Sequence, residues 1–345
     1  MTDILMQYGL FLAKAVTVVV MAWIIIAMVV SMSHRRGRPP DRLEVRCLNE
    51  KYEEMSDILK EAMLSKKQFK KILKERKARR QAEEKRKLAG ASKSRKRIFV
   101  LNFRGDIKAT AVSSLREEVT AVLTMATPED EVLLRLENSG GLVHEHGLAA
   151  SQLQRIRSRQ IRLTVAVDKV AASGGYLMAC VGNRIIAAPF AVVGSIGVLA
   201  QLPNFHRLLE WHGVDFEQVN AGEHKKTLSM FGRNTDEERA KVKEQLEDLH
   251  GLFKDLVAQN RPGVDVGSVA TGEYWYGARA RKLNLIDDLT TSDDYLLAAS
   301  QNTEVYEVTY SIKKPFAERM ALLVDMTTER LFYSWWRRAE ESRWA

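Results

Sequence analysis

The chain has 345 residues, of which 46% are hydrophobic and 28% are charged. This length allows one large or two ordinary domains, and the apolar content is ample for a buried core, which excludes a disordered protein. The two cysteines are too few for a framework of disulfide bonds. The formal net charge of +9 arises before residue 98: residues 34–97 hold 23 Lys and Arg against 10 Asp and Glu, whereas residues 98–345 hold 29 against 33.

The N-terminal part contains a long apolar segment. No charged residue occurs from Ala15 to Met32, and eighteen helical residues span about 27 Å, which is enough to cross a membrane. A cleaved signal peptide is the alternative, but Asp3 precedes the segment and a basic run follows it, the reverse of the signal-peptide pattern. We therefore expect an uncleaved, single-pass anchor helix within residues 1–33.

Residues 34–97 form a basic segment next to this anchor. Its Lys and Arg favour an anionic lipid surface, at about 1 kcal/mol for each basic residue close to the membrane. Nucleic acid is not expected as a partner, because no base-reading motif or aromatic interleaving accompanies the charges. Apolar residues recur at roughly helical spacing from Met55 to Leu73, so the segment is either a solvated, surface-associated helix or a flexible tether.

From residue 98 onward, strands and helices alternate. Apolar runs predict buried strands at 98–103, 132–136 and 161–167, and the segments between them predict helices at 113–124 and 148–156. Such alternation is typical of an α/β fold with a mostly parallel sheet, whose loops gather at the strand ends.

Two glycine loops follow predicted strands: Asn138-Ser139-Gly140-Gly141 and Ala172-Ser173-Gly174-Gly175-Tyr176. A serine hydroxyl is a poor nucleophile unless a base takes its proton. The small residues after Ser173 would let a substrate carbonyl approach the backbone, where the following amide can face a developing oxyanion. A plain turn or helix start is nevertheless the more common meaning of a serine followed by two glycines.

Residues 185–204 carry no charge, but we interpret them as core rather than as a second membrane span. Pro189, Gly194 and Gly197 interrupt the segment, and residues 185–188 are typical of a short buried strand. Taken alone, Ser195 in this segment would only satisfy backbone groups in a turn.

Lys225 is the candidate base for a serine-lysine hydrolase. It follows a predicted strand at 216–220, so it falls in another strand-end loop where it could meet Ser173, whereas Lys226 should point away. A lysine acts as a base only when it is largely neutral, which requires an apolar surround and no carboxylate contact. We therefore predict that the side chain of Glu223 faces elsewhere. An exposed lysine pair is otherwise ordinary solvated surface.

The remaining signals are structural. Thr235 and Glu238 form a capping box that predicts a helix to about Gln259. Cys180 is expected in the core, and no metal or cofactor is expected, because His144 and His146 lack the spacing of a zinc helix motif. Residues 313–345 predict an amphipathic helix that docks on a neighbouring subunit, lies in the membrane interface or packs on the core.

The order of these motifs resembles the signal peptide peptidase A family, in particular its SohB-type membrane serine peptidases. The match runs from about Ile98 to Asp287. It includes both glycine loops and continues with Gly194-Ser195-Ile196-Gly197-Val198, Gly222-Glu223-His224-Lys225, the stretch from Gly272 to Ala278, and Leu285-Ile286-Asp287. The resemblance implies a crotonase/Clp-protease-like fold of repeated β-α units.

The resemblance also implies a role for individual residues. Ser173 matches the nucleophile, Lys225 matches the general base, and Ser195 matches the serine that hydrogen-bonds this lysine. The amides of Gly141 and Gly174 would form the oxyanion hole. A homo-oligomer, peptide or protein substrates and a bacterial inner-membrane location are further implications. The side of the membrane stays open, because the arginines after the anchor favour a cytoplasmic active site and the family expectation favours the opposite side.

Two positions depart from the family's pattern. Ser139 stands where proline usually stiffens the glycine loop, and because serine fixes no φ angle a looser, less efficient loop is expected. Asn284 stands in place of a glycine, and asparagine tolerates the left-handed conformation better than other side chains.

Four segments are therefore expected: a membrane anchor helix at 1–33, a basic juxtamembrane linker at 34–97, a serine-lysine peptidase domain at 98–312 and an amphipathic helix at 313–345. The favoured function is a membrane-anchored serine endopeptidase that cuts unfolded or membrane-released peptides through an acyl-enzyme. One alternative is a low-activity or inactive scaffold that assembles partners at the membrane, consistent with Ser139. Another is a crotonase-like enzyme for acyl thioesters, which would not require the pair Ser173 and Lys225.

Overall fold

The computed structural model describes residues 42–88, 96–222 and 228–312, together with Lys14, Val16, Thr17, Val20 and Met21. The chain divides into two units, Met1–Arg42 with Ser311–Ala345, and Leu43–Tyr310. The expected anchor helix lies almost entirely outside the described residues, as does the helix expected over 313–345. No helix within the described ranges is long and apolar enough to cross a membrane.

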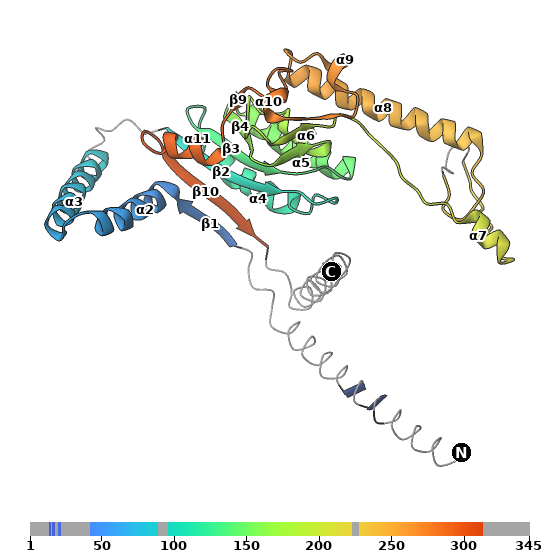
Figure 1. Cartoon of the computed structure of the whole chain (residues 1–345), viewed down its shortest axis with the longest axis horizontal. Coiled ribbons are helices and arrows are strands. Elements are labelled where there is room, and N and C mark those ends of the chain that lie inside the picture. Colours follow the sequence, from blue (N-terminus) through green and yellow to red (C-terminus); the bar gives the residue numbers. More distant parts are fainter. Residues whose placement is uncertain are drawn as a thin grey trace, which may run out of the picture. The chain divides into compact units, whose positions relative to one another are not determined.

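The second unit is built on a seven-stranded sheet with the order β1-β10-β2-β3-β4-β6-β9 (Figure 1). From β10 to β9 all neighbouring strands are parallel. The α/β fold expected from the alternating pattern is therefore confirmed. The strands are β1 (Arg42–Cys47), β2 (Arg97–Arg104), β3 (Glu131–Glu137), β4 (Arg162–Val167), β6 (Arg184–Ala187), β9 (Asp288–Leu289) and β10 (Glu304–Ser311).

Helices bury both faces of this sheet, which explains why its central strands are almost continuously apolar. Side chains alternate along β2: Phe99 and Leu101 join the main core with helices α4 (Val112–Leu123), α5 (Val143–Ser158) and α6 (Gly174–Ala179). Ile98 and Val100 point to the opposite face and pack in a smaller cluster with α11 (Ser292–Ala299).

A second, three-stranded sheet carries the loops of interest. Its strands are β5 (Val170–Ala172), β7 (Val192–Gly194) and β8 (Tyr274–Tyr276). β5 and β7 are parallel, and β8 is antiparallel to β7. The apolar segment 185–204 thus contributes β6 and β7 to the fold, as expected from its interrupting Pro and Gly residues. Four further helices are α7 (His206–Trp211), α8 (Asp236–Asn260), α9 (Val266–Val269) and α10 (Gly277–Ala280).

The compact unit begins earlier than the boundary expected at residue 98. β1 is the neighbour of β10 in the sheet, and Leu48 is buried in the smaller core cluster. Asn49 also ties the segment to the domain, because its Nδ2 donates to the carbonyl oxygens of Ser300 and Thr303, and its Oδ1 accepts from the amide of Val305. β1 was missed because its few apolar residues stand between charged ones.

The rest of the basic segment is helical where it is described. Helices α2 (Leu48–Met63) and α3 (Lys66–Leu88) follow one another, and the Arg76 guanidinium lies 2.6 Å from the Asp57 carboxylate.

The predicted strand at 216–220 is wrong. These residues have no regular secondary structure, and Val219 is 97% exposed. Phe216 packs against Phe231, with 5.8 Å between ring centroids, rather than in a sheet. The apolar side chain of Phe216 is thus covered by an aromatic ring and not by a paired strand.

Buried Glu118 on α4 makes stability depend on pH. Its Oε1 accepts from the Tyr310 amide at 2.8 Å, and burial raises its pKa to about 7. Because the folded protein holds this proton more tightly than the unfolded chain, the free energy of unfolding falls as pH rises from about 4.5 to about 7.

We predict that Glu118→Gln, which keeps the acceptor but cannot ionise, removes this fall. The variant should match the parent below pH 4.5 and exceed its stability at pH 8 by about 3 kcal/mol. Unfolding midpoints of both proteins measured across this pH range test the prediction. Parallel curves at all pH values would contradict it.

Candidate active site

Ser173 and Ser195 leave two adjacent strands at the same end. In the parallel pair β5 and β7, Ala172 lies opposite Gly194, so Ser173 and Ser195 each follow directly on one member of a paired couple. The amide of Ser173 also donates to the Gly194 carbonyl at 2.8 Å. Strand pairing thus brings together two of the residues proposed for the site.

Both serines have positive φ angles, 52° at Ser173 and 51° at Ser195. Such angles cost about 1–3 kcal/mol in a residue other than glycine and occur preferentially at functional sites. Ser173 occupies the N-cap of α6, yet its side chain makes no capping hydrogen bond. A plain helix start therefore does not account for this serine.

The glycine loop 138–141 is joined to β5 immediately before Ser173. The Asn138 amide donates to the Val170 carbonyl at 2.9 Å, and the Ala172 amide donates to the Asn138 carbonyl at 3.0 Å. At Gly140, where φ is 94°, an added Cβ would lie only 2.8 Å from the Ser173 Cβ. Only glycine allows the loop to approach the serine this closely.

Two backbone amides beside Ser173 remain available to a ligand. The Gly140 amide is occupied, since it donates to Asn138 Oδ1 at 2.9 Å. The Gly141 amide donates to no acceptor in the described part of the chain, and the Gly174 amide begins α6, where an amide has no intrahelical acceptor. Gly141, Gly174 and Ser173 line the same cavity.

Asn138 restrains the glycine loop 138–141. This loop was expected to be looser than in the family because Ser139 stands in place of proline. The bond from the Gly140 amide to Asn138 Oδ1 spans Ser139 in the manner of an Asx turn, and Asn138 is buried. The side chain before Ser139 therefore provides a restraint that a proline ring provides through φ.

Gly174 and Gly175 are also required for packing within the protein. A Cβ on Gly174 would lie 2.6 Å from His146 Cγ, and a Cβ on Gly175 would lie 2.1 Å from the Asn138 carbonyl oxygen. The protein thus fills the space on the Cβ side of both glycines, whereas Gly174 also lines the cavity.

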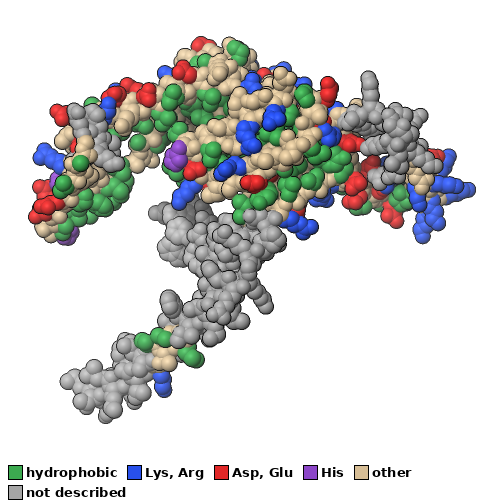
Figure 2. All heavy atoms as spheres, turned by 180° about the vertical axis from the view of Figure 1, so that it is seen from behind, with side chains coloured by type: hydrophobic (Ala, Val, Ile, Leu, Met, Phe, Trp, Pro, Cys, Tyr) green, Lys and Arg blue, Asp and Glu red, His purple; other side chains and the backbone are tan. Residues whose placement is uncertain are grey.

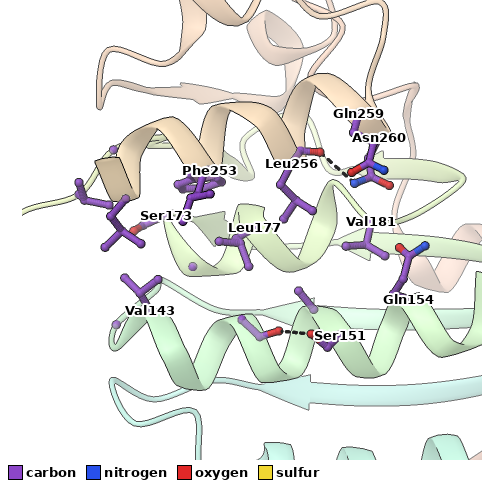
Figure 3. A pocket seen from close by; sticks show the side chains of 18 residues that line it. Val143, Ser151, Gln154, Ser173, Leu177, Val181, Phe253, Leu256, Gln259 and Asn260 are labelled. Carbon is purple, nitrogen blue, oxygen red and sulfur yellow. Dashed lines mark hydrogen bonds between the residues drawn. The ribbon is translucent and has the colours of Figure 1, made fainter. Parts of the chain in front are cut away.

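A cavity of about 480 Å³ extends from Ser173 between α5, α6 and α8 (Figure 3). Its walls near the serine are apolar, with Val143, Leu177, Phe253 and Leu256. The end of the cavity far from Ser173 is lined by the polar side chains of Gln154, Gln259 and Asn260 (Figure 3). The arrangement is suited to an apolar side chain placed beside the Ser173 hydroxyl.

Lys225 lies outside the described residues, with its neighbours 223–227. The described residues that follow this segment begin at 228 and are held near the start of α8, where the Ser229 amide donates to Asn234 Oδ1 at 2.7 Å. α8 begins with the predicted capping box of Thr235 and Glu238, which is confirmed. At 1.5 Å per residue, Thr235 is roughly 27 Å from Phe253, the α8 residue that lines the cavity with Ser173.

Two further expectations, on Cys180 and Asn284, are confirmed by the described residues. Cys180 is buried in the core, and burial raises the pKa of its thiol to about 12, so it is not a nucleophile. Asn284 has φ of 59°, the left-handed conformation expected where the family has glycine. The described ranges contain no group of three or more His, Cys, Asp or Glu side chains placed to hold a metal.

Sequence analysis missed the side chains of Asn138 and His146, which lie directly behind the glycine loop. His146 Nε2 is 3.2 Å from Asn138 Oδ1, and both residues are buried. The available signal was helical periodicity: His146 shares the apolar face of α5 with Ala149, Ala150 and Leu153.

Comparisons with known proteins agree along nearly the whole chain. The family model described as peptidase family S49 N-terminal matches residues 3–153, and that described as peptidase family S49 matches residues 155–306. A probable protease SohB of Haemophilus influenzae is 44% identical over 326 residues, covering 92% of each chain. A probable protease SohB of Buchnera aphidicola subsp. Acyrthosiphon pisum is 48% identical over 231 residues, covering 67% of this chain and 69% of that protein.

Among solved structures, a mutant of the 1510-N membrane-bound stomatin-specific protease is similar with a TM-score of 0.42 and 14% identity. The similar region covers 62% of this chain and 98% of that protein.

The packing of Gly175 gives a direct test of the loop geometry. We predict that Gly175→Ala, whose Cβ would meet the Asn138 carbonyl, lowers the free energy of unfolding by about 2–3 kcal/mol. Gly251→Ala is the matched control: Gly251 is also helical but an added Cβ meets nothing within 4 Å, so the change should stabilise by about 0.5–1 kcal/mol. Thermal unfolding of both variants measures the difference, and equal effects would refute the close approach.

Proposed function

Because the chain belongs to peptidase family S49, we propose that it is a membrane-anchored serine endopeptidase with Ser173 as nucleophile and Lys225 as general base. Family membership makes it a peptidase. The assignment of the nucleophile depends chiefly on one observation. Ser173 has a positive φ, its hydroxyl makes no capping hydrogen bond, and it lies at the wall of an apolar cavity that Gly141 and Gly174 also line.

The proposed reaction proceeds through an acyl-enzyme. Lys225 Nζ takes the proton of Ser173 Oγ as this oxygen attacks the carbonyl carbon of the scissile bond. The amides of Gly141 and Gly174 donate to the oxyanion that forms, and the lysine then passes the proton to the leaving nitrogen. Water, activated by the same lysine, hydrolyses the ester. Ser195, the strand-end neighbour of Ser173, is proposed to hydrogen-bond the lysine and orient it.

The cavity supports extended or unfolded peptides as substrates. Its apolar walls favour an apolar side chain next to the scissile bond. A folded protein would have to expose such a residue in an extended segment before it could reach Ser173.

We also propose attachment to the bacterial inner membrane through residues 15–32, with the basic segment on anionic lipid. In support, α2 exposes a row of apolar side chains, Met55, Ile58, Leu59 and Met63, and the helix that follows it is strongly basic. This combination is typical of a helix pair at a membrane interface.

A homo-oligomer is supported by a second exposed surface. Apolar side chains are exposed in the region of α7, on the left of Figure 2. They include Phe205, Leu208, Trp211, Phe216 and Phe231. An exposed apolar patch of this kind is typical of a protein interface. The alternative of an inactive scaffold draws on Ser139, and the hydrogen bond from the Gly140 amide to Asn138 Oδ1 argues against a loose loop at this residue.

The first test is loss of activity. Ser173→Ala and Lys225→Ala should each lower cleavage of an unstructured peptide library by at least ~10³-fold, because they remove the nucleophile and its base. Lys226→Ala is the matched control and should cleave like the parent. Mass spectrometry of the products measures all four proteins, each confirmed to be folded.

Equal cleavage by all four proteins would overturn the proposed dyad and favour the scaffold. Mixing the two inactive variants adds a second readout: recovery of cleavage would mean that serine and lysine of one site come from different copies of the chain.

The membrane proposal has its own test, with residues 1–33 and 313–345 deleted so that of the expected membrane-binding segments only the basic one remains. This protein should float with vesicles that contain anionic lipid and stay unbound with neutral vesicles or at high salt. Replacing Lys70 and Lys74 by Glu should weaken binding by at least ~10-fold, at about 1 kcal/mol per charge. Equal binding to neutral and anionic vesicles would contradict the electrostatic contribution.

A further inference from the structure

We propose that His146 is a positioning residue that, through Asn138, holds the glycine loop and both oxyanion donors in place. The inference rests on the proposed serine peptidase mechanism. Neither His146 nor Asn138 lines the cavity, so the proposed role does not involve contact with substrate.

His146 is fully buried, and each of its ring nitrogens faces a hydrogen-bond acceptor. Nδ1 is 2.9 Å from the Leu142 carbonyl oxygen, and Nε2 is 3.2 Å from Asn138 Oδ1. A neutral imidazole donates from one nitrogen only, so one of these two contacts is a hydrogen bond and the other is a packing contact. The imidazole is therefore held rigidly between the start of α5 and the glycine loop.

The orientation of the Asn138 amide follows from its other contacts. The Gly140 amide can only donate, so the atom it meets at 2.9 Å is the oxygen, Oδ1. The nitrogen, Nδ2, then points to Met178 Sδ at 3.4 Å. Oδ1 therefore also faces His146 Nε2, and we assign the imidazole proton to Nε2, which makes this nitrogen the donor in that contact.

Glycines on both sides leave Asn138 no room to move. A Cβ on Gly105 would lie 2.5 Å from Asn138 Cγ, and a Cβ on Gly175 would lie 2.1 Å from the Asn138 carbonyl oxygen. The asparagine is enclosed between two backbones, so its side-chain oxygen is a fixed point to which the Gly140 amide is attached.

His146 contacts both halves of the proposed oxyanion hole. It reaches the loop that carries the Gly141 amide through Asn138, and its ring lies directly against Gly174, where an added Cβ would be 2.6 Å from His146 Cγ. A small displacement of either amide weakens hydrogen bonds that form fully only in the transition state. Loss of the histidine donor should therefore lower kcat and leave KM nearly unchanged.

The test compares three variants of the full-length chain with the parent. His146→Phe fills the space without a donor and should lower kcat roughly 10–100-fold, less than complete removal of an oxyanion donor. His146→Gln retains an N–H donor and should keep kcat within about threefold of the parent. His144→Phe, two residues away with an exposed side chain, is the matched control and should leave kcat unchanged.

A second pair of variants keeps the proposal testable if His146→Phe does not fold. Asn138→Ala removes the shared acceptor and should lower kcat. Adding Ser139→Pro should recover much of it, because the ring supplies rigidity at a residue whose amide donates to no acceptor in the described part of the chain.

A parent-like kcat in His146→Phe overturns the inference, as does an equal loss in His146→Gln or a failure of Ser139→Pro to improve Asn138→Ala. Parent activity that persists in Ser173→Ala would instead overturn the proposed function, so the two failures are distinguishable.

Discussion

The parallel pairing of β5 with β7 is the constraint on which the site depends. It places Ala172 opposite Gly194 and so makes the next two residues, Ser173 and Ser195, neighbours. The same strand binds the glycine loop through the bridge between Asn138 and Ala171. One short strand therefore sets the relative positions of three loops that are distant in sequence, and a one-residue shift in its register would separate all of them.

The central strands of the seven-stranded sheet could be predicted because their signals are local and strong, whereas β1, β9 and β10 were not predicted. The buried strands β2, β3 and β4 are runs of branched apolar residues, and the capping box at Thr235 marks the start of α8 directly. β1 could not be recognised, since its alternating charged residues carry little information without β10 beside it. The strand predicted at 216–220 was wrong because an apolar pattern does not show what will cover it. Here Phe216 packs against the ring of Phe231 and not against a neighbouring strand.

The candidate site divides in the same way. Ser173, Ser195 and the glycine loops are visible as motifs, and motif order identified the family. Asn138 and His146, which lie behind these loops, do not form a sequence motif. One follows a strand, the other lies on a face of α5, and only the fold brings them together. The close approaches of Gly105, Gly174 and Gly175 exist only once Asn138 and His146 are in position. A glycine in the sequence can indicate a close contact, but it does not identify the residue with which the contact is made.

The long helix α8 is attached unevenly, and this has a mechanical consequence. Of its 25 residues only Phe253 and Val257 are buried, both in the half that walls the cavity. Its first turns carry the segment that flanks residues 223–227 and are stabilised mainly from within, by the capping box and ion pairs such as that of Lys241 with Glu244. A tilt of about 5° about Phe253 would move Thr235, roughly 27 Å away, by about 2 Å. The position of the N-terminal end of α8 therefore depends on how Phe253 and Val257 pack near its C-terminal end.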